Sequence, residues 1–177
     1  MENLGRVISE HPFCKGLERR YVDLLTSCAS NVRFEKGHHL FREGGEANQF
    51  YLIREGKVLL EILAPQSPSL NLETVQAGEV LGWSWLVPPY CWRFGARAVE
   101  PVSVIAVNGK CLRAKCEKNS GLGYELLKRT VEIVGQRLEA TQFRLLDLYS
   151  AEVRREQAVA PGAGDEFFGG TGRSREK

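Results

Sequence analysis

One short stretch of the chain, GEVLGWSWLVPPYCWRFGARA at residues 78–98, concentrates side chains that could bind a ligand. All three tryptophans of the protein lie in it, together with two arginines and a pair of prolines. Aromatic rings with interleaved polar groups are typical of small-molecule pockets, whereas aromatic rings also fill awkward corners of a core. The sequence leaves both alternatives open, and the polar residues between the tryptophans favour the pocket.

The predicted ligand-binding residues of this stretch are glycines that allow close approach, aromatic walls and polar anchors: Gly78, Gly82, Trp83, Ser84, Trp85, Tyr90, Trp92, Arg93 and Phe94. In the first alternative the tryptophans wall a pocket for a small ligand, and Ser84, Tyr90 and Arg93 anchor it. In the second alternative the indoles fill that space, and the domain is an inert interaction scaffold.

Other residues that could do chemistry do not form a recognisable site. His38 and His39 are adjacent, so on a strand their side chains would point to opposite faces. The sequence has no nucleophile elbow, no Walker loop and no Ser/His/Asp order. We therefore predict no catalytic residues, no metal ligands and a protein that is not an enzyme.

Length and composition are those of an ordinary globular protein. The 177 residues suffice for one domain with an appendage, and 43% of them are hydrophobic and 26% charged. The net charge of +2 lacks the basic excess of a nucleic-acid binder. No apolar run approaches the roughly 20 residues that span a bilayer, and no signal peptide is recognisable. We expect a cytoplasmic protein without membrane contact.

The cysteine pattern predicts reduced thiols. The chain has five cysteines, at positions 14, 28, 91, 111 and 116, so the count is odd, and no CxxC pair is present. We therefore predict neither a disulfide framework nor a structural zinc site.

The first two thirds of the chain predict a helical segment followed by a β-roll. Residues 1–30 form the N-terminal segment, with a short helix over residues 16–29. Residues 31–107 alternate short apolar runs with glycine-bearing turns, which predicts an antiparallel β-roll or jelly roll containing the loop at 78–98. The sequence REGK at residues 54–57 predicts a hairpin between two of the strands.

Two helices are predicted over residues 108–150. Asn108 would cap a short helix to about Glu117, and Ser120 a long helix to about Tyr149. Apolar residues of the long helix alternate spacings of four and three: Leu127, Val131, Val134, Leu138, Thr141, Leu145 and Leu148, with Thr141 as the polar member. This heptad pattern predicts a homodimer, the alternative being a helix buried only against its own domain. Residues 151–177 predict a disordered tail.

The residues HHLFREGGEANQFYLIREGKVLLEI, at 38–62, and AGEVLG, at 77–82, resemble the cyclic nucleotide-binding domain family. This family includes the catabolite activator class of bacterial regulators. The resemblance covers about residues 11–149 and implies a mainly β fold with flanking helices, in which an antiparallel β-roll is followed by a long dimerisation helix. It also implies a cyclic phosphate bound by backbone N–H groups and an arginine, and a glutamate on the ribose.

Two positions depart from the family pattern. Trp83 stands after the second glycine, where the family has its ribose-binding glutamate. Counting back from Arg97-Ala98 places Trp92 at the position of the phosphate arginine, and Arg93 follows one residue later. The resemblance therefore implies either a cyclic nucleotide held through Arg93 or another small anionic ligand, and no certain cofactor.

Together these features predict a stand-alone regulatory sensor module that binds a small ligand in the roll and signals to a partner protein through a dimeric helix. Regulators of the catabolite activator class carry a helix-turn-helix domain after the long helix. The residues after Tyr149 do not resemble one, so direct DNA binding is not expected. The alternative is a catabolite activator-like transcription regulator that acts on DNA through a partner.

Overall fold

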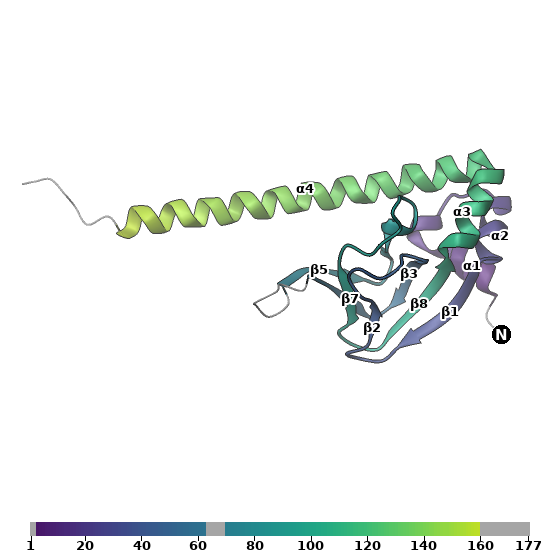
Figure 1. The fold of residues 1–177 in the computed structure, drawn as a ribbon, viewed down its shortest axis with the longest axis horizontal. Helices are drawn as coiled ribbons and strands as arrows, with labels where there is room; N and C mark the ends of the chain where they lie inside the picture. The colour runs from purple at the N-terminus through teal and green to yellow at the C-terminus, as the bar shows by residue number, and fades with distance from the viewer. Residues whose placement is uncertain (1–2, 63–69, 160–177) are drawn as a thin grey trace, which may run out of the picture. The chain divides into compact units, whose positions relative to one another are not determined.

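The computed structural model describes residues 3–62 and 70–159. The chain forms two compact units, Met1–Val131 and Glu132–Lys177, and Figure 1 shows the elements in colour order along the chain. In that order they are α1 (Leu4–Glu10), η1 (Pro12–Cys14), α2 (Arg19–Thr26), β1 (Ala29–Phe34), β2 (His39–Phe41), β3 (Gln49–Glu55), β4 (Lys57–Ile62), β5 (Leu70–Gln76), β6 (Val80–Leu81), η2 (Trp83–Trp85), β7 (Gly95–Ala98), β8 (Val102–Asn108), α3 (Gly109–Lys118) and α4 (Ser120–Val159).

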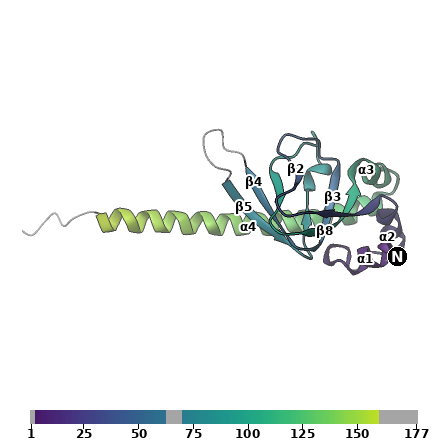
Figure 2. The same ribbon diagram turned by 90° about the horizontal axis from the view of Figure 1, so that it is seen from below.

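The strands form two four-stranded antiparallel sheets. Their strand orders are β1-β8-β3-β6 and β2-β7-β4-β5. Side chains of both sheets meet in one core, to which Tyr51 and Ile53 of β3, Val58 of β4 and Val104 of β8 contribute. In both views of the ribbon, α1, α2 and α3 gather at one end of the roll (Figures 1 and 2). The predicted fold class, a mainly β roll with flanking helices, is confirmed.

The central strands β3 and β8 are buried on both faces, which explains their nearly continuous apolar runs. One face of each strand points into the roll, and the other face is covered by helical segments. Phe50 of β3 lies on the face that the helical segments cover. Its ring packs edge-on against Phe13 of η1, with centroids 5.1 Å apart. Strand β3 thereby contacts the N-terminal helical segment.

The chain crosses between the sheets at Gly56. Strand β3 belongs to the first sheet and β4 to the second, so the hairpin predicted at residues 54–57 is wrong. The backbone of Gly56 has φ of 84°, and a Cβ there would lie 2.4 Å from the carbonyl oxygen of Pro101. Glycine is therefore required, but for a tight crossover rather than for a hairpin. Strand β4 instead pairs with β5.

The helices differ from the predicted ones in four respects. Helix α1 was not predicted, and the helix expected over residues 16–29 is confined to α2. The long helix α4 is capped by Asn119, whose side chain accepts from the N–H of Leu122 at 3.1 Å, instead of by Ser120. It continues to Val159, so residues 151–159 are helical, while the rest of the predicted tail lies outside the described residues.

Helix α3 begins where the sequence predicts. The Asn108 side chain accepts from the N–H of Cys111 at 2.8 Å, which satisfies one of the N–H groups left unpaired at a helix start.

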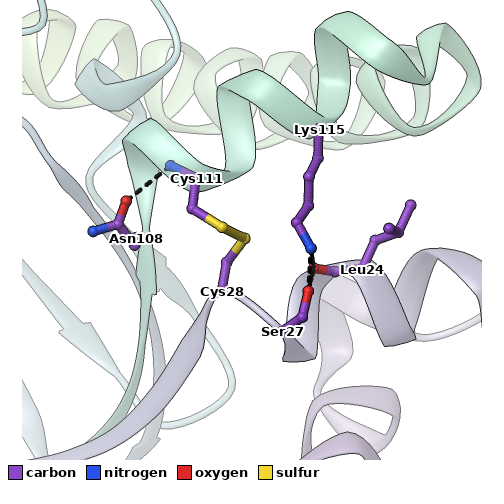
Figure 3. Close-up of a disulfide and its surroundings, with 6 residues drawn as sticks. All are labelled: Leu24, Ser27, Cys28, Asn108, Cys111 and Lys115. Atoms are coloured by element: carbon purple, nitrogen blue, oxygen red, sulfur yellow. Dashed lines mark hydrogen bonds between the residues drawn. A yellow bond between two sulfur atoms is a disulfide. The ribbon is translucent and has the colours of Figure 1, made fainter.

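Two of the cysteines are joined, contrary to the prediction. Cys28, just before β1, forms a disulfide with Cys111 in the first turn of α3, with the Cα atoms 5.9 Å apart (Figure 3). The expectation of reduced thiols was wrong for this pair because an odd count and the lack of CxxC say nothing about residues 83 positions apart that the fold brings together. Cys14, Cys91 and Cys116 are free thiols.

Candidate functional site

The candidate site is the loop between β6 and β7, residues 82–94, which begins at a glycine that the geometry requires. Gly82 has φ of 93° and immediately precedes the short helix η2. A Cβ at this position would lie 2.7 Å from the indole of Trp92 and 3.3 Å from the carbonyl oxygen of Gln49. Gly82 therefore allows the left-handed turn and also the close approach of an aromatic ring.

Trp92 fills the interior of the roll. Its side chain is 5% exposed and belongs to the core between the two sheets. The indole stacks on Phe41, with ring centroids 3.8 Å apart, and Phe41 in turn stacks on Tyr51 at 6.0 Å. Burial raises the pKa of the Tyr51 phenol to about 12, and its hydroxyl donates to the carbonyl of Leu40 at 3.3 Å. The rings therefore pack against one another in an apolar core.

Backbone hydrogen bonds hold Trp92 in this position. Its N–H donates to the carbonyl oxygen of Gly45, and its own carbonyl accepts from the N–H of Gly44, both at 2.9 Å. A β-bridge between Glu46 and Cys91 extends the same pairing. The turn after β2 and the end of the candidate loop thus brace each other, so the inward direction of the indole is set by both segments.

Trp85 lies on the helical side of β3 instead of inside the roll. Its side chain is 1% exposed and packs at a tilt on Phe50, with centroids 5.8 Å apart. A Cβ added to Gly109, the first residue of α3, would lie 3.0 Å from the Cβ of Trp85. Trp85 is therefore wedged between β3 and the start of α3.

An arginine of α3 secures the same loop. The guanidinium of Arg113 donates to the carbonyl oxygen of Trp85 and lies 4.0 Å from the ring centroid of Tyr90. A cation over an aromatic face in partly buried surroundings is attractive. Tyr90 has φ of 55°, follows the cis peptide bond between Pro88 and Pro89, and accepts from the N–H of Ala47 at 2.7 Å. Helix α3 thus holds the middle of the loop.

The remaining predicted site residues lie elsewhere. Trp83 is 38% exposed and Arg93 is exposed, whereas Ser84 is buried and Phe94 is half-buried. Gly78 forms the turn that precedes β6, with φ of 89°. The nine predicted residues therefore divide between the roll interior, the surface beside α3 and solvent, and the contacts given above do not bring them into one site.

The heptad residues of α4 have a different environment from its first turns. Leu122 and Leu126, near the start of the helix, are fully buried. The heptad residues themselves are exposed hydrophobic side chains: Leu127, Val131, Val134, Leu138, Leu145 and Leu148. The hydroxyl of Thr141 donates to the carbonyl oxygen of Arg137 at 2.8 Å, so this polar member satisfies its own donor within the helix.

Sequence reasoning missed two residues that position the loop. Phe41 was missed because alternation along a strand places Leu40 and Phe41 on different faces, whereas in the structure both pack against the core, in a strand whose register shifts between His39 and Phe41. No signal pointed to Arg113, since a cation–π contact across 23 residues is a product of the fold.

Within residues 3–62 and 70–159, no group of three or more His, Cys, Asp or Glu side chains is placed to hold a metal ion. No helix in this part of the chain is long and apolar enough to cross a bilayer.

Comparison with known proteins places this architecture in a family. The anaerobic regulatory protein of Bacillus subtilis is 29% identical over 109 residues, which are 60% of this chain and 45% of that protein. A CRP-like cAMP-activated global transcriptional regulator of Mycobacterium tuberculosis is 23% identical over 150 residues, 85% of this chain and 65% of that protein. The chain therefore spans less than two thirds of the length of these relatives.

A solved structure and a family model are also similar to this chain. A candidate cyclic nucleotide-binding protein of Geobacter metallireducens superposes with a TM-score of 0.68 at 29% identity, over 78% of this chain and 99% of that one. The model of the cyclic nucleotide-binding domain matches residues 31–119, from β1 to the end of α3. The chain belongs to the cyclic nucleotide-binding domain family.

Proposed function

We propose that this chain is a non-enzymatic regulatory module that works as a homodimer, with α4 passing the state of the β-roll to a partner protein. The observation that carries the proposal is the exposed apolar row along α4, in which Leu127, Val131 and Leu138 are 48%, 60% and 56% exposed. A contiguous apolar surface of this kind marks an interaction site.

A second copy of the chain is the occupant that fits this row. The alternating four- and three-residue spacing is the period that lets two helices supercoil with their apolar residues facing each other. A two-fold interface presents the same surface twice, so a row of this type is complementary to itself. Identical helices need no further partner to cover it.

The regulatory part of the proposal is supported by the relatives. The two named above are a regulatory protein and a transcriptional regulator. For this chain we propose control of a partner protein. Action on DNA through such a partner is the second candidate, which retention of genomic fragments at moderate salt would favour in a gel-shift assay.

Sedimentation velocity tests the dimer. We expect the wild-type chain to sediment as a dimer and Leu138→Glu to sediment as a monomer, because a carboxylate in the apolar row is desolvated and unpaired. Gln136→Glu is the matched control, since it adds the same charge on the opposite side of the same helix and is expected to remain dimeric. A monomeric wild type, or a dimeric Leu138→Glu chain, contradicts the proposal.

The ligand is a separate part of the proposal. We propose that the roll does not hold a cyclic nucleotide through the family's usual contacts, since Trp92 and Trp83 stand where the resemblance places the phosphate arginine and the ribose glutamate. A small anionic ligand would instead use the exposed Arg93 as its charged anchor.

A thermal-shift screen of nucleotides and other phosphate compounds tests this anchor. A bound anion raises the melting temperature with its concentration. Arg93→Ala is expected to abolish that shift, and Arg33→Ala, which removes another exposed arginine, is expected to keep it. An undiminished shift in Arg93→Ala rules out Arg93 as the anchor.

A further inference from the structure

The disulfide joins α3 to the junction between α2 and β1. Cys28 lies two residues after the end of α2, and Cys111 lies in the first turn of α3. Figure 3 shows a second connection one helical turn further along α3, where the ammonium group of Lys115 donates to the carbonyl of Leu24 at 3.2 Å and also contacts the hydroxyl of Ser27. One side of α3 is thus attached to the end of α2 by a covalent bond and by a cation.

The same helix also holds the candidate loop. Arg113, two residues after Cys111, contacts the carbonyl oxygen of Trp85 and the ring of Tyr90. Gly109, two residues before Cys111, is packed against Trp85. Any change in the position of the first turns of α3 therefore reaches residues 83–93 through two separate contacts.

We propose that Cys28 and Cys111 are a reversible redox pair, whose disulfide holds α3 and, through Arg113, the loop at residues 83–93, and whose reduction loosens both. The bridge closes a segment of 83 residues that contains the whole roll. A cross-link over so long a segment strongly restricts the unfolded chain and the opened forms of the domain. The proposal does not depend on the α4 dimer.

The reaction is thiol–disulfide exchange. Two thiols of a dithiol reductant supply two electrons and two protons, the bond between the two Sγ atoms breaks, and the reductant leaves as a disulfide. Oxidation is the reverse, with glutathione disulfide taking up the electrons and protons and leaving as two molecules of glutathione.

The surroundings of Cys111 favour its sulfur as the leaving thiolate. It lies at the start of α3, where the unpaired N–H groups of a helix present positive charge, and Lys115 places an ammonium group one turn away. Cys111 is only partly buried, so the bridge can be approached from the side of α3. A stabilised thiolate leaves faster in exchange reactions.

Two of the other cysteines are protected from the same chemistry. Burial raises the pKa of the Cys14 thiol to about 12. Burial, helped by the neighbouring carboxylate of Glu117, raises the pKa of Cys116. Thiols held protonated at neutral pH react slowly, so Cys14 and Cys116 compete little with the Cys28–Cys111 pair for exchange.

A redox titration of the full chain tests reversibility. The protein is equilibrated with mixtures of reduced and oxidised glutathione, denatured, and labelled with a maleimide mass tag. We expect three labels per chain under oxidising mixtures and five under reducing ones, because the sequence has five cysteines and three are free in the structure. The same number of labels in every mixture, whether three or five, overturns the proposal.

Hydrogen exchange measured by mass spectrometry tests the consequence. On reduction we expect amides of residues 83–93 and 109–118 to exchange about tenfold faster, as in a local opening. Cys28→Ser should show the fast pattern under both conditions, and Cys116→Ser, which removes a free thiol of the same helix, should respond as wild type does. If these amides exchange at equal rates in the oxidised and the reduced wild-type protein, the proposal is overturned, whatever the variants show.

Arg113→Gln isolates the coupling step. This variant loses the cation over Tyr90, so we expect α3 to keep its redox response while residues 83–93 exchange fast in both states. If the loop of Arg113→Gln still slows on oxidation as it does in wild type, Arg113 does not carry the coupling. Because these readouts come from α3 and the loop, a chain that fails to dimerise can still pass them.

Discussion

The indole of Trp92 lies nearly flat on the ring of Phe41 inside the roll, with 3.8 Å between the ring centroids and 12° between the ring planes. The two residues come from opposite ends of the chain segment that forms the second sheet, β2 and the loop before β7. This pair puts neutral aromatic surface at the centre of a fold whose family resemblance implies a charged side chain at position 92. Side chains of the chain itself, Trp92 and Phe41, therefore pack in the interior of the roll.

The first prediction concerns the stability that this ring provides. Trp92→Ala removes a buried indole from the core and is expected to lower the free energy of unfolding by about 3–5 kcal/mol, measured by urea denaturation. Trp83→Ala is the control, because that indole is 38% exposed; its cost is expected to be about 1 kcal/mol or less. Equal losses in the two variants would show that Trp92 is not the supporting ring.

The second prediction concerns a polar pair on the second sheet. The carboxylate of Glu61 is 5% exposed and accepts from the guanidinium of Arg97 at 3.1 Å, while His39 Nδ1 lies 3.7 Å away. Arg97→Leu leaves this carboxylate largely unpaired, so we expect a loss of about 2 kcal/mol in the free energy of unfolding, because an unsatisfied buried charge keeps its desolvation penalty.

The control for that prediction is an exposed ion pair. Arg33 lies 3.8 Å from the carboxylate of Glu35, and both side chains are largely in solvent. Arg33→Leu is expected to change the free energy of unfolding by less than about 0.5 kcal/mol. If Arg97→Leu is as mild as Arg33→Leu in the same urea titration, the Glu61 pair contributes no more than a surface contact.

The third prediction concerns pH. Burial lowers the pKa of His11 below the usual 6.5, and its ring bridges the carbonyl of Ile53 at 3.2 Å and the N–H of Phe13 at 3.3 Å. Below pH 6.5 the unfolded chain takes up a proton that the folded chain resists, so stability falls as the pH is lowered from 7.5 to 5.5. Above that window the ring is neutral in both states and the contribution is constant.

Urea denaturation at several pH values measures this effect. Between pH 7.5 and 5.5, we expect the free energy of unfolding of His11→Gln to fall by about 1 kcal/mol less than that of the wild type. His38→Gln removes an exposed imidazole and is expected to keep the wild-type loss. A His11→Gln curve parallel to that of wild type would assign the acid sensitivity to other groups.

The sequence predicted the order of helix, roll and long helix because hydrophobic periodicity changes from one kind of element to the next. The hairpin predicted at Gly56 was wrong for a physical reason. A glycine turn between two apolar strands is the same local signal whether the strands pair with each other or join different sheets, and only tertiary packing decides between them. The prediction of reduced thiols failed for Cys28 and Cys111 for a similar reason, since no local pattern links residues 83 positions apart.

The candidate site shows the limit most clearly. Trp83 and Trp85 are separated by one residue, yet Trp83 is exposed and Trp85 is buried, because the short helix η2 turns them to different sides. Composition could show that aromatic rings gather at residues 83–92, and counting from Arg97-Ala98 could show that Trp92 takes an unusual place. Neither could show that the rings would separate, since that depends on Phe41, Phe50 and Arg113 contributed by other elements.

Isothermal titration of the wild-type chain with cyclic AMP tests the central claim most directly. With Trp92 filling the roll, and with no guanidinium or carboxylate at positions 92 and 83, we expect no saturable binding up to about 1 mM nucleotide, whereas the cAMP-activated relative from Mycobacterium tuberculosis serves as the positive control. Saturable binding of one cyclic AMP per chain would contradict the account, since it would show that the chain binds the nucleotide with tryptophans at positions 92 and 83 in place of the charged residues that the family resemblance implies.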